Sequence, residues 1–374
     1  MTDVRGGAPW DERGGRLRGA LDLLSGRYPP FVFGFGVGRR LPVFHFHETT
    51  RAHLEPALEY LADNGYRTVN CDDMAAVAAG RLDPPPKKVL LAFDDALTSL
   101  WTVAAPLLRR YGLTAVTYAI PGRIAEATSV RPTIDDGPVE VTAERAPNPF
   151  ATWPELRALS ASGVIDVQSH TWSHAMIFTD AHPRGVVTPE TAHEHPLSLP
   201  RINETDPPQF LAATRLGFPM YTRRTRMSDA RRFLPDLDAC AAVEDVVASR
   251  GGRDFFERPD WAEELQPWLN SVSGRWESDD ERDRAIAHEL AMARDVLEHR
   301  LGKPVRHVCL PRGVTCPRTR EALERLGFHS AVANRLEGEL AVRPGDDPFY
   351  LKRLPNKHIF ALPGRGRKTF LTLA

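Results

Sequence analysis

The sequence has few cysteines, and they are not arranged in pairs. Cys71, Cys240, Cys309 and Cys316 are scattered, and the two that lie nearest each other have six residues between them. That spacing fits neither a redox pair nor a common zinc motif. We therefore expect four free thiols in a reducing compartment.

Net charge and long apolar runs are also missing. The chain has 48 Lys and Arg against 49 Asp and Glu, so its net charge of −1 argues against a nucleic-acid or anionic-membrane binder. No segment reaches the roughly 20 apolar residues of a membrane span. Residues 1–18 alternate charges and glycines and lack the apolar core of a secretory signal. We expect a cytoplasmic protein.

Strand and helix patterns alternate along most of the chain. Buried-strand patterns are expected at 41–47, 66–70, 89–93, 114–120, 164–167, 305–310, 330–333 and 350–354. Helical patterns are expected at 12–26, 51–63, 71–79, 100–111, 153–162, 279–301 and 317–326. This alternation predicts an α/β fold with a parallel sheet or barrel. The pattern is lost over 181–278, which is rich in proline, arginine and aspartate.

Two polar groups follow predicted strands directly. Asp94 and Asp95 come after 89–93, and His170 and His174, with three residues between them, come after 164–167. Ligand sites of parallel α/β folds lie at this end of the strands. Two histidines and one carboxylate suit Zn²⁺ or another divalent transition metal, and the second carboxylate can serve as a general base toward water. Either group alone could be a helix cap or a coincidence, but their combination favours a hydrolytic metal site.

These residues carry a family resemblance. Residues 91–96 (LAFDDA) resemble the TFDDG motif of NodB-type polysaccharide deacetylases (carbohydrate esterase family 4), and residues 169–174 (SHTWSH) resemble their SHTxxH motif. The resemblance covers roughly 41–180 and 280–356. It implies an α/β fold, a distorted (β/α) barrel over 41–374, with residues 1–40 as an N-terminal extension. The segment 181–278 would be a long insertion at the active-site rim.

The resemblance also implies a reaction, the hydrolysis of an N-acyl group, usually N-acetyl, on a sugar. Asp94 would be the general base. Asp95, His170 and His174 would bind a divalent metal, with Zn expected first and Co, Ni, Fe or Mn as alternatives. The backbone N–H of Arg312 would stabilise the oxyanion.

Three positions depart from the family pattern. Ala92 and Ala96 replace the motif's threonine and glycine, which leaves the geometry of that turn open. Cys309 stands where many members have an arginine that orients the base, and Arg353 could supply this charge instead. His358 is the nearest candidate for the family's late general-acid histidine.

Four further residues are candidates for substrate contact. His47 matches a family histidine expected at the barrel mouth, and Trp172 lies between the two ligand histidines. Arg223 and Arg224 of the insertion could clamp a phosphate or carboxylate. The expected cytoplasmic location disfavours cell-wall or chitin polymers and favours an amino sugar or glycan precursor as the substrate.

Two other functions stay open. The chain could be an amidohydrolase of a cyclic ureide or another small non-sugar amide, since some relatives of this fold act there. It could also be a non-catalytic metal-binding or carbohydrate-binding relative, which the altered turn residues would allow.

Overall fold

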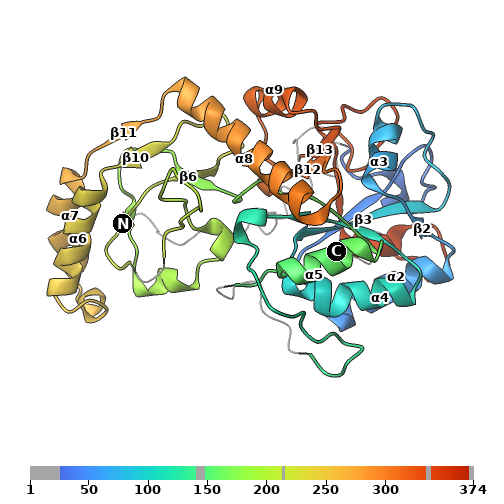
Figure 1. Ribbon diagram of the computed structural model, residues 1–374, viewed down its shortest axis with the longest axis horizontal. Helices are drawn as coiled ribbons and strands as arrows, with labels where there is room; N and C mark the ends of the chain where they lie inside the picture. The colour runs from blue at the N-terminus through green and yellow to red at the C-terminus, as the bar shows by residue number, and fades with distance from the viewer. Residues whose placement is uncertain (1–25, 140–147, 213–214, 334–337, 370–374) are drawn as a thin grey trace.

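The computed structural model describes residues 26–139, 148–212, 215–333 and 338–369. The helix expected over 12–26 lies almost wholly outside this range. Figure 1 shows a sheet with its covering helices on one side of the molecule and helices α6 and α7 on the other, with α8 running between them. None of the helices within the described ranges has both the length and the apolarity of a bilayer span. All four cysteines are buried and free, as expected.

A parallel sheet forms the centre of the larger part. Its strand order is β13-β12-β5-β4-β3-β1-β14, with β2 paired to β3. Every pairing in it is parallel. The strands are β1 (Val43–Phe46), β2 (Arg67–Thr68), β3 (Lys88–Asp95), β4 (Ala115–Ala119), β5 (Ile165–Ser169), β12 (His307–Cys309), β13 (Ser330–Val332) and β14 (Leu354–Pro355).

The sheet is a curled half-barrel, and the expectation of a full barrel is corrected on this point. Strands β13 and β14 lie at the two ends of the strand order and do not pair with each other. An isolated bridge between Val332 and Leu351 and a backbone hydrogen bond from Ala331 N to the Pro348 carbonyl connect β13 to the segment before β14, without forming a strand pair. The expected α/β class is confirmed.

Helices cover the sheet where periodicity predicted them. They are α2 (Arg51–Asp63), α3 (Cys71–Ala78), α4 (Ala105–Arg110), α5 (Trp153–Ala161), α8 (Asp279–Leu301) and α9 (Pro317–Arg325). A capping box at Ser278 and Glu281 begins α8, and Gly302 in the left-handed conformation ends it.

The helix expected over 100–111 is not uniform. Its first part is a π-helical turn, Leu100–Ala104, and only Ala105–Arg110 is α-helical. Pro106 has no N–H to donate to the carbonyl of Thr102, so the regular α-helical ladder cannot pass through it.

The insertion is built around an apolar cluster of its own. This cluster includes Phe218, Val243, Phe255 and Leu265. The helices are α6 (Leu237–Ser249) and α7 (Trp261–Ser271). Three short antiparallel pairs join β6 (Met176–Phe178) to β9 (Arg223–Thr225), β7 (Gly185–Val186) to β8 (Pro219–Met220), and β10 (Phe233–Pro235) to β11 (Gly274–Trp276). The boundaries 1–40 and 181–278 stay predictions.

Candidate active site

The two predicted polar groups meet at the carboxyl edge of the sheet. Strand β3 ends on Asp94 and Asp95, and His170 follows the end of β5. The register pairs Asp95 with Ala119 and Ala119 with Ser169. Neighbouring parallel strands therefore bring the aspartates and the first histidine to one level.

Asp95, His170 and His174 lie close enough to share a cation. Their candidate ligand atoms all lie within 4.8 Å of one another. His170 Nε2 is 3.3 Å from Asp95 Oδ1. The carbonyl oxygen of Cys309 lies 2.6 Å from His170 Nδ1, so that nitrogen carries the hydrogen and Nε2 faces Asp95.

Two atoms of this group lack the bonds that buried polar atoms normally make. Asp95 Oδ1 and His174 Nδ1 are buried and have no hydrogen-bond partner among the described residues. A carboxylate and two imidazoles are also a donor set that Zn²⁺ and similar divalent ions prefer. These three residues therefore fit a metal ion.

Asp94 has a different environment. Arg353 donates two hydrogen bonds to it, from Nη1 to Oδ1 and from Nη2 to Oδ2, each 2.6 Å long. Burial alone would raise the pKa of Asp94, but the charge and hydrogen bonds of Arg353 outweigh it and hold the pKa well below its usual range. Arg353 is thus the cation paired with Asp94, and Cys309 Sγ lies 4.0 Å from Asp94 Oδ2. The expected role of Arg353 in place of an arginine at position 309 stays a prediction.

His47 stands beside Asp94 at the open side of the site. Its Nε2 is 3.7 Å from Asp94 Oδ2, and its side chain is 35% exposed. His45, on the same strand face, is partly buried, and its ring lies 5.8 Å from that of His47. Burial, with added repulsion from Arg353, lowers the pKa of His45 to about 3. His45 is therefore neutral, and the role of His47 as a substrate contact stays a prediction.

The turns that carry these side chains have unusual backbone geometry. Five non-glycine residues in them have left-handed φ values: Asp95 (67°), Ala96 (52°), Thr171 (67°), His174 (53°) and Arg312 (56°). Such conformations cost energy in non-glycine residues and occur often at functional sites. Ala96 thus keeps the left-handed turn in the place of the motif's glycine.

Residues that the sequence did not single out hold the histidine-bearing loop, residues 169–174. Glu289, a buried residue of α8, accepts hydrogen bonds from Ser173 N (2.9 Å) and Ser173 Oγ (2.5 Å). Its other contact is Arg201, whose Nη1 donates to the same carboxylate at 3.2 Å. In sequence Glu289 resembles any helix carboxylate, and its only signal is its place beside Leu290 in the apolar stripe.

Trp172, in the middle of this loop, connects the loop to α8 and to the insertion. Its backbone N–H donates to the Glu289 carbonyl (2.8 Å), and its indole Nε1 donates to Asp206 of the insertion (2.7 Å). The ring is buried, and its role as a substrate contact stays a prediction.

Arg123 is a second residue that sequence analysis missed. It lies in a 3₁₀ turn after β4, Pro121–Arg123, and its Nε donates to the carbonyl of Ser173 at 3.1 Å. Its guanidinium carbon lies 3.4 Å from the centroid of the Phe210 ring, and its Nη2 is buried without a hydrogen-bond partner among the described residues. Burial lowers the pKa of Arg123 to about 9. The site therefore contains an additional cation near Asp95.

Among the remaining predicted residues, Arg312 and Arg223 donate side-chain hydrogen bonds to residues outside this cluster, although the charge of Arg312 helps to lower the pKa of His174, after the larger effects of burial and His170. Arg312 follows β12 in a turn, Pro311–Gly313, and its Nη2 donates to Ser198 Oγ at 2.8 Å. Arg223 pairs with Glu194 at 2.7 Å inside the insertion, and Arg224 is exposed. The predicted roles of all three stay predictions.

His358 lies in a 3₁₀ segment, Asn356–Ala361, packed against the ring of Tyr28 at 5.5 Å. It is buried, and neither ring nitrogen has a hydrogen-bond partner among the described residues. It lies against Tyr28 and near the charge of Lys357. The structure does not bring it together with the other site residues, and its role as general acid stays a prediction.

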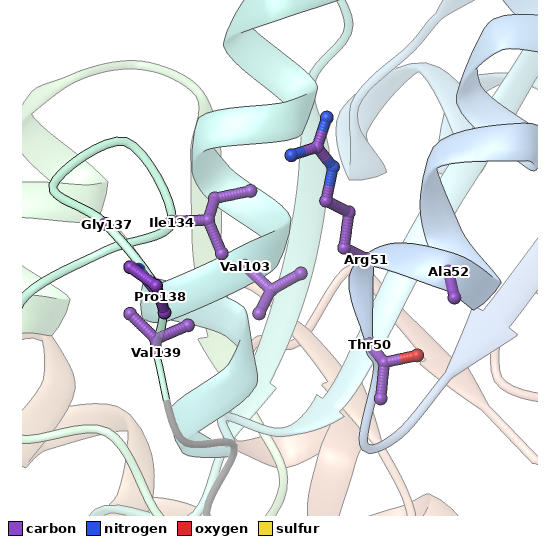
Figure 2. Close-up of a pocket in the computed structure, with 8 residues that line it drawn as sticks. All are labelled: Thr50, Arg51, Ala52, Val103, Ile134, Gly137, Pro138 and Val139. Carbon is purple, nitrogen blue, oxygen red and sulfur yellow. The ribbon is translucent and has the colours of Figure 1, made fainter.

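Two cavities lie apart from these residues. The larger, about 440 Å³, lies between the start of α2, the π-helical turn and residues 134–139, and includes Arg51, Val103 and Ile134 in its lining (Figure 2). The smaller, about 250 Å³, lies in the insertion against Phe256 and Trp261. Neither is lined by a predicted metal-binding or catalytic residue.

Comparison with known proteins agrees with this geometry. A family model described as polysaccharide deacetylase matches residues 81–195. The chain is 29% identical over 128 residues to the poly-β-1,6-N-acetyl-D-glucosamine N-deacetylase of Escherichia coli (strain K12), covering 34% of this chain and 18% of that protein. It is 28% identical over 89 residues to a putative polysaccharide deacetylase of Bacillus subtilis (strain 168), covering 22% and 32%. The matches thus span less than a third of each relative.

A solved structure shares the fold. The deacetylase domain of BpsB from Bordetella bronchiseptica superposes with a TM-score of 0.51 at 17% identity, over 85% of this chain and 96% of that one. The expected NodB-type α/β fold is confirmed in this half-barrel form.

Proposed function

We propose that the chain is a member of the polysaccharide deacetylase family, whose model matches residues 81–195, and that it is a metal-dependent enzyme that hydrolyses the N-acetyl group of an amino sugar. The observation that carries the proposal is that the two adjacent aspartates have different partners. Asp94 is held by Arg353, whereas Asp95 faces His170 and His174.

Asp95, His170 and His174 would hold the cation. Lewis acidity toward the amide oxygen is the chemistry that a divalent ion held there would supply. We propose Zn²⁺ first, because two imidazoles and a carboxylate suit it, although Co²⁺ or Ni²⁺ can take the same set.

Asp94 would take the proton of the attacking water. Arg353 keeps Asp94 ionised at neutral pH, and only the ionised carboxylate can accept a proton from water. Water adds to the acyl carbon, the C–N bond breaks, and the amine leaves with one proton as acetate is released. His47, 3.7 Å from Asp94 and partly exposed, is well placed to carry that proton to the amine.

The substrate class is proposed from chemistry and from the relatives. The Escherichia coli relative is named for poly-β-1,6-N-acetyl-D-glucosamine, so an oligomer of that polymer is the first substrate to test. A nucleotide-linked N-acetylated sugar is the second, since it would fit the expected cytoplasmic location. That location stays a prediction, which cell fractionation would test.

The decisive experiment measures acetate release. Metal-free protein is reloaded with Zn²⁺, Co²⁺ or Ni²⁺ and assayed on both substrates. We expect release that chelation abolishes and that Asp94→Asn and Asp95→Asn each reduce at least 100-fold. Asp280→Asn, an exposed change on α8, is the control and should keep full activity. Failure of every loaded form to release acetate, or an active Asp94→Asn variant, would contradict the proposal.

A further inference from the structure

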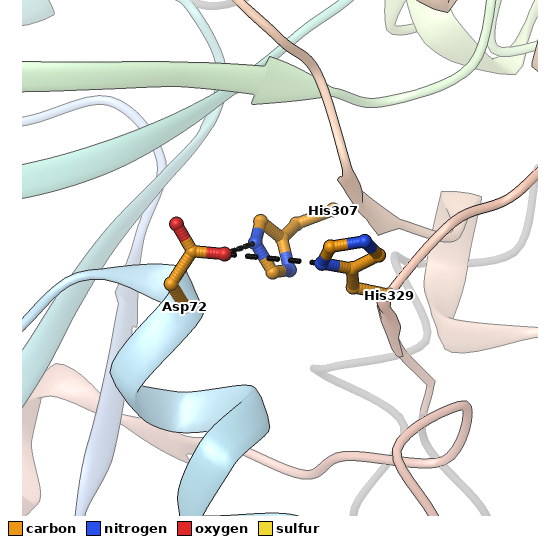
Figure 3. A group of neighbouring side chains, drawn as sticks. All are labelled: Asp72, His307 and His329. Atoms are coloured by element: carbon orange, nitrogen blue, oxygen red, sulfur yellow. Dashed lines mark hydrogen bonds and ion pairs between the residues drawn. The ribbon is translucent and has the colours of Figure 1, made fainter.

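A second group of metal-binding side chains lies at the opposite edge of the sheet. Asp72 is in the first turn of α3, His307 is the first residue of β12, and His329 directly precedes β13. Figure 3 shows the two imidazole rings next to the Asp72 carboxylate. The active site lies at the other end of β12, where the Cys309 carbonyl holds His170. The two clusters are therefore separate.

The distances suit a single ion. Ligands about 2.1 Å from a tetrahedral Zn²⁺ lie about 3.4 Å from one another. Asp72 Oδ1 is 3.1 Å from His307 Nε2 and 3.9 Å from His329 Nδ1, and one donor atom from each residue lies within 4.8 Å of the others. Modest side-chain rotation would bring all three onto one cation.

The ring nitrogen of His307 that faces away from Asp72 already has a hydrogen-bond partner. Its Nδ1 lies 2.8 Å from Ser330 Oγ, so the ring is fixed with Nε2 toward Asp72. A hydrogen bond on the second ring nitrogen is the usual support of a metal-bound histidine. His307 is 2% exposed, whereas the side chains of Asp72 and His329 are 65% and 49% exposed. An ion there would have one buried ligand and an open side for water.

A simple hydrogen bond does not account for the whole arrangement. It explains the approach of His307 to Asp72, but His329 Nδ1 is too far from the same oxygen to share it by hydrogen bonding. Two imidazoles, one in β12 and one directly before β13, thus converge on one carboxylate oxygen from a helix. We propose that Asp72, His307 and His329 bind a divalent transition metal ion, Zn²⁺ or a similar one, that joins α3 to β12 and β13.

Metal stoichiometry tests this proposal. Tag-free full-length protein is stripped, equilibrated with Zn²⁺ and analysed for bound metal. If the active site also binds Zn²⁺, the wild type should bind two equivalents and His329→Gln one. If the active site binds none, the numbers become one and zero. The loss on changing His329 is therefore independent of the proposed deacetylase activity.

A variant that lacks the proposed active-site ligands allows Zn²⁺ binding at the second site to be measured alone. Asp95→Asn/His174→Ala should still bind one Zn²⁺, with a higher Tm when Zn²⁺ is added. Adding Asp72→Asn or His329→Gln should weaken binding at least ten-fold and remove the Tm shift. His299→Gln, an exposed histidine on α8, is the matched control.

Two results would overturn the proposal. One is a wild type and a His329→Gln variant with equal metal content. The other is a folded Asp95→Asn/His174→Ala protein with no bound Zn²⁺. If that double variant fails to fold, the wild-type comparison decides alone.

Discussion

At the residue scale, Asp94 is a buried carboxylate whose charge is balanced by Arg353. The two side chains form a bidentate pair with both hydrogen bonds at 2.6 Å. Removing one member of such a pair leaves an uncompensated buried charge, which typically costs about 3–5 kcal/mol. Arg353 therefore contributes to the stability of the folded protein and keeps the proposed base ionised.

Arg353→Gln should lower the free energy of unfolding by about 3 kcal/mol at pH 7. It should also raise the pKa of Asp94, because the charge that lowers it is gone. A base must be ionised to act, so the acid limb of the pH–rate profile should move to higher pH. Urea unfolding and pH–rate profiles check this, with Arg353→Lys as the variant that keeps the charge. An unshifted acid limb in Arg353→Gln would show that Arg353 does not act on the base.

At the scale of elements, the histidine-bearing loop 169–174 depends on two neighbours that carry no ligand. Helix α8 supports it through Glu289, and the turn after β4 contacts it through Gly122, whose N–H donates to the Trp172 carbonyl at 2.8 Å. The placement of His170 and His174 is therefore a property of three packed segments.

Glu289→Gln should act as a change in a positioning residue. The amide cannot accept both Ser173 hydrogen bonds and the Arg201 contact, so the loop loses part of its support. Changes in groups that hold metal ligands typically cost 10–100-fold in affinity or activity. We expect a loss of this size in Zn²⁺ affinity by calorimetry and a parallel loss in kcat. Asp280→Asn on the same helix should change neither, and unaltered Zn²⁺ affinity in Glu289→Gln would refute the positioning role.

Gly122→Ala should disturb the loop from the other side. A Cβ at this position would lie 2.5 Å from the Trp172 carbonyl oxygen and 3.0 Å from its indole ring, so the loop must shift. We expect at least a ten-fold loss of kcat with little loss of secondary structure by circular dichroism. Gly36→Ala, where a Cβ meets nothing within 4 Å, is the control. Equal rates in the two variants would mean that the loop tolerates the shift.

At the scale of the whole molecule, buried neutral histidines make stability depend on pH. Burial, assisted by Lys357, lowers the pKa of His358 to about 4, below the ordinary 6.5. The unfolded chain thus binds more protons between these values, and stability falls as the pH drops from 6.5 toward 4. The full loss from this group is on the order of 3 kcal/mol.

His358→Gln should therefore flatten the acid side of the stability curve. Urea unfolding at pH 7 and pH 4.5 measures it, and the drop between the two should be smaller in His358→Gln than in wild type. His299→Gln, an exposed histidine, should keep the wild-type drop. Identical drops in all three proteins would mean that His358 is protonated in the folded state.

Local patterns predicted the elements that carry the site. The apolar runs of β3 and β5 and the polar residues after them could be predicted because each is a continuous pattern in the sequence. Glu289 could not be found this way, since it lies 116 positions from Ser173 and its burial depends on packing. The pairing of Asp72 with His307 spans 235 positions, and the half-barrel depends on which distant strands pair. The insertion's apolar cluster was hidden by short segments without clear periodicity.

The pairing of Asp94 with Arg353 also bears on how the chain matures. The two residues are 259 positions apart, so during synthesis the ribosome delivers the carboxylate long before the guanidinium. A nascent chain that ends before Arg353 cannot bury an ionised Asp94 without cost. The proposed catalytic base therefore gains its final environment only when β14 joins β1, so the proposed hydrolytic activity would arise late in the biogenesis of the protein.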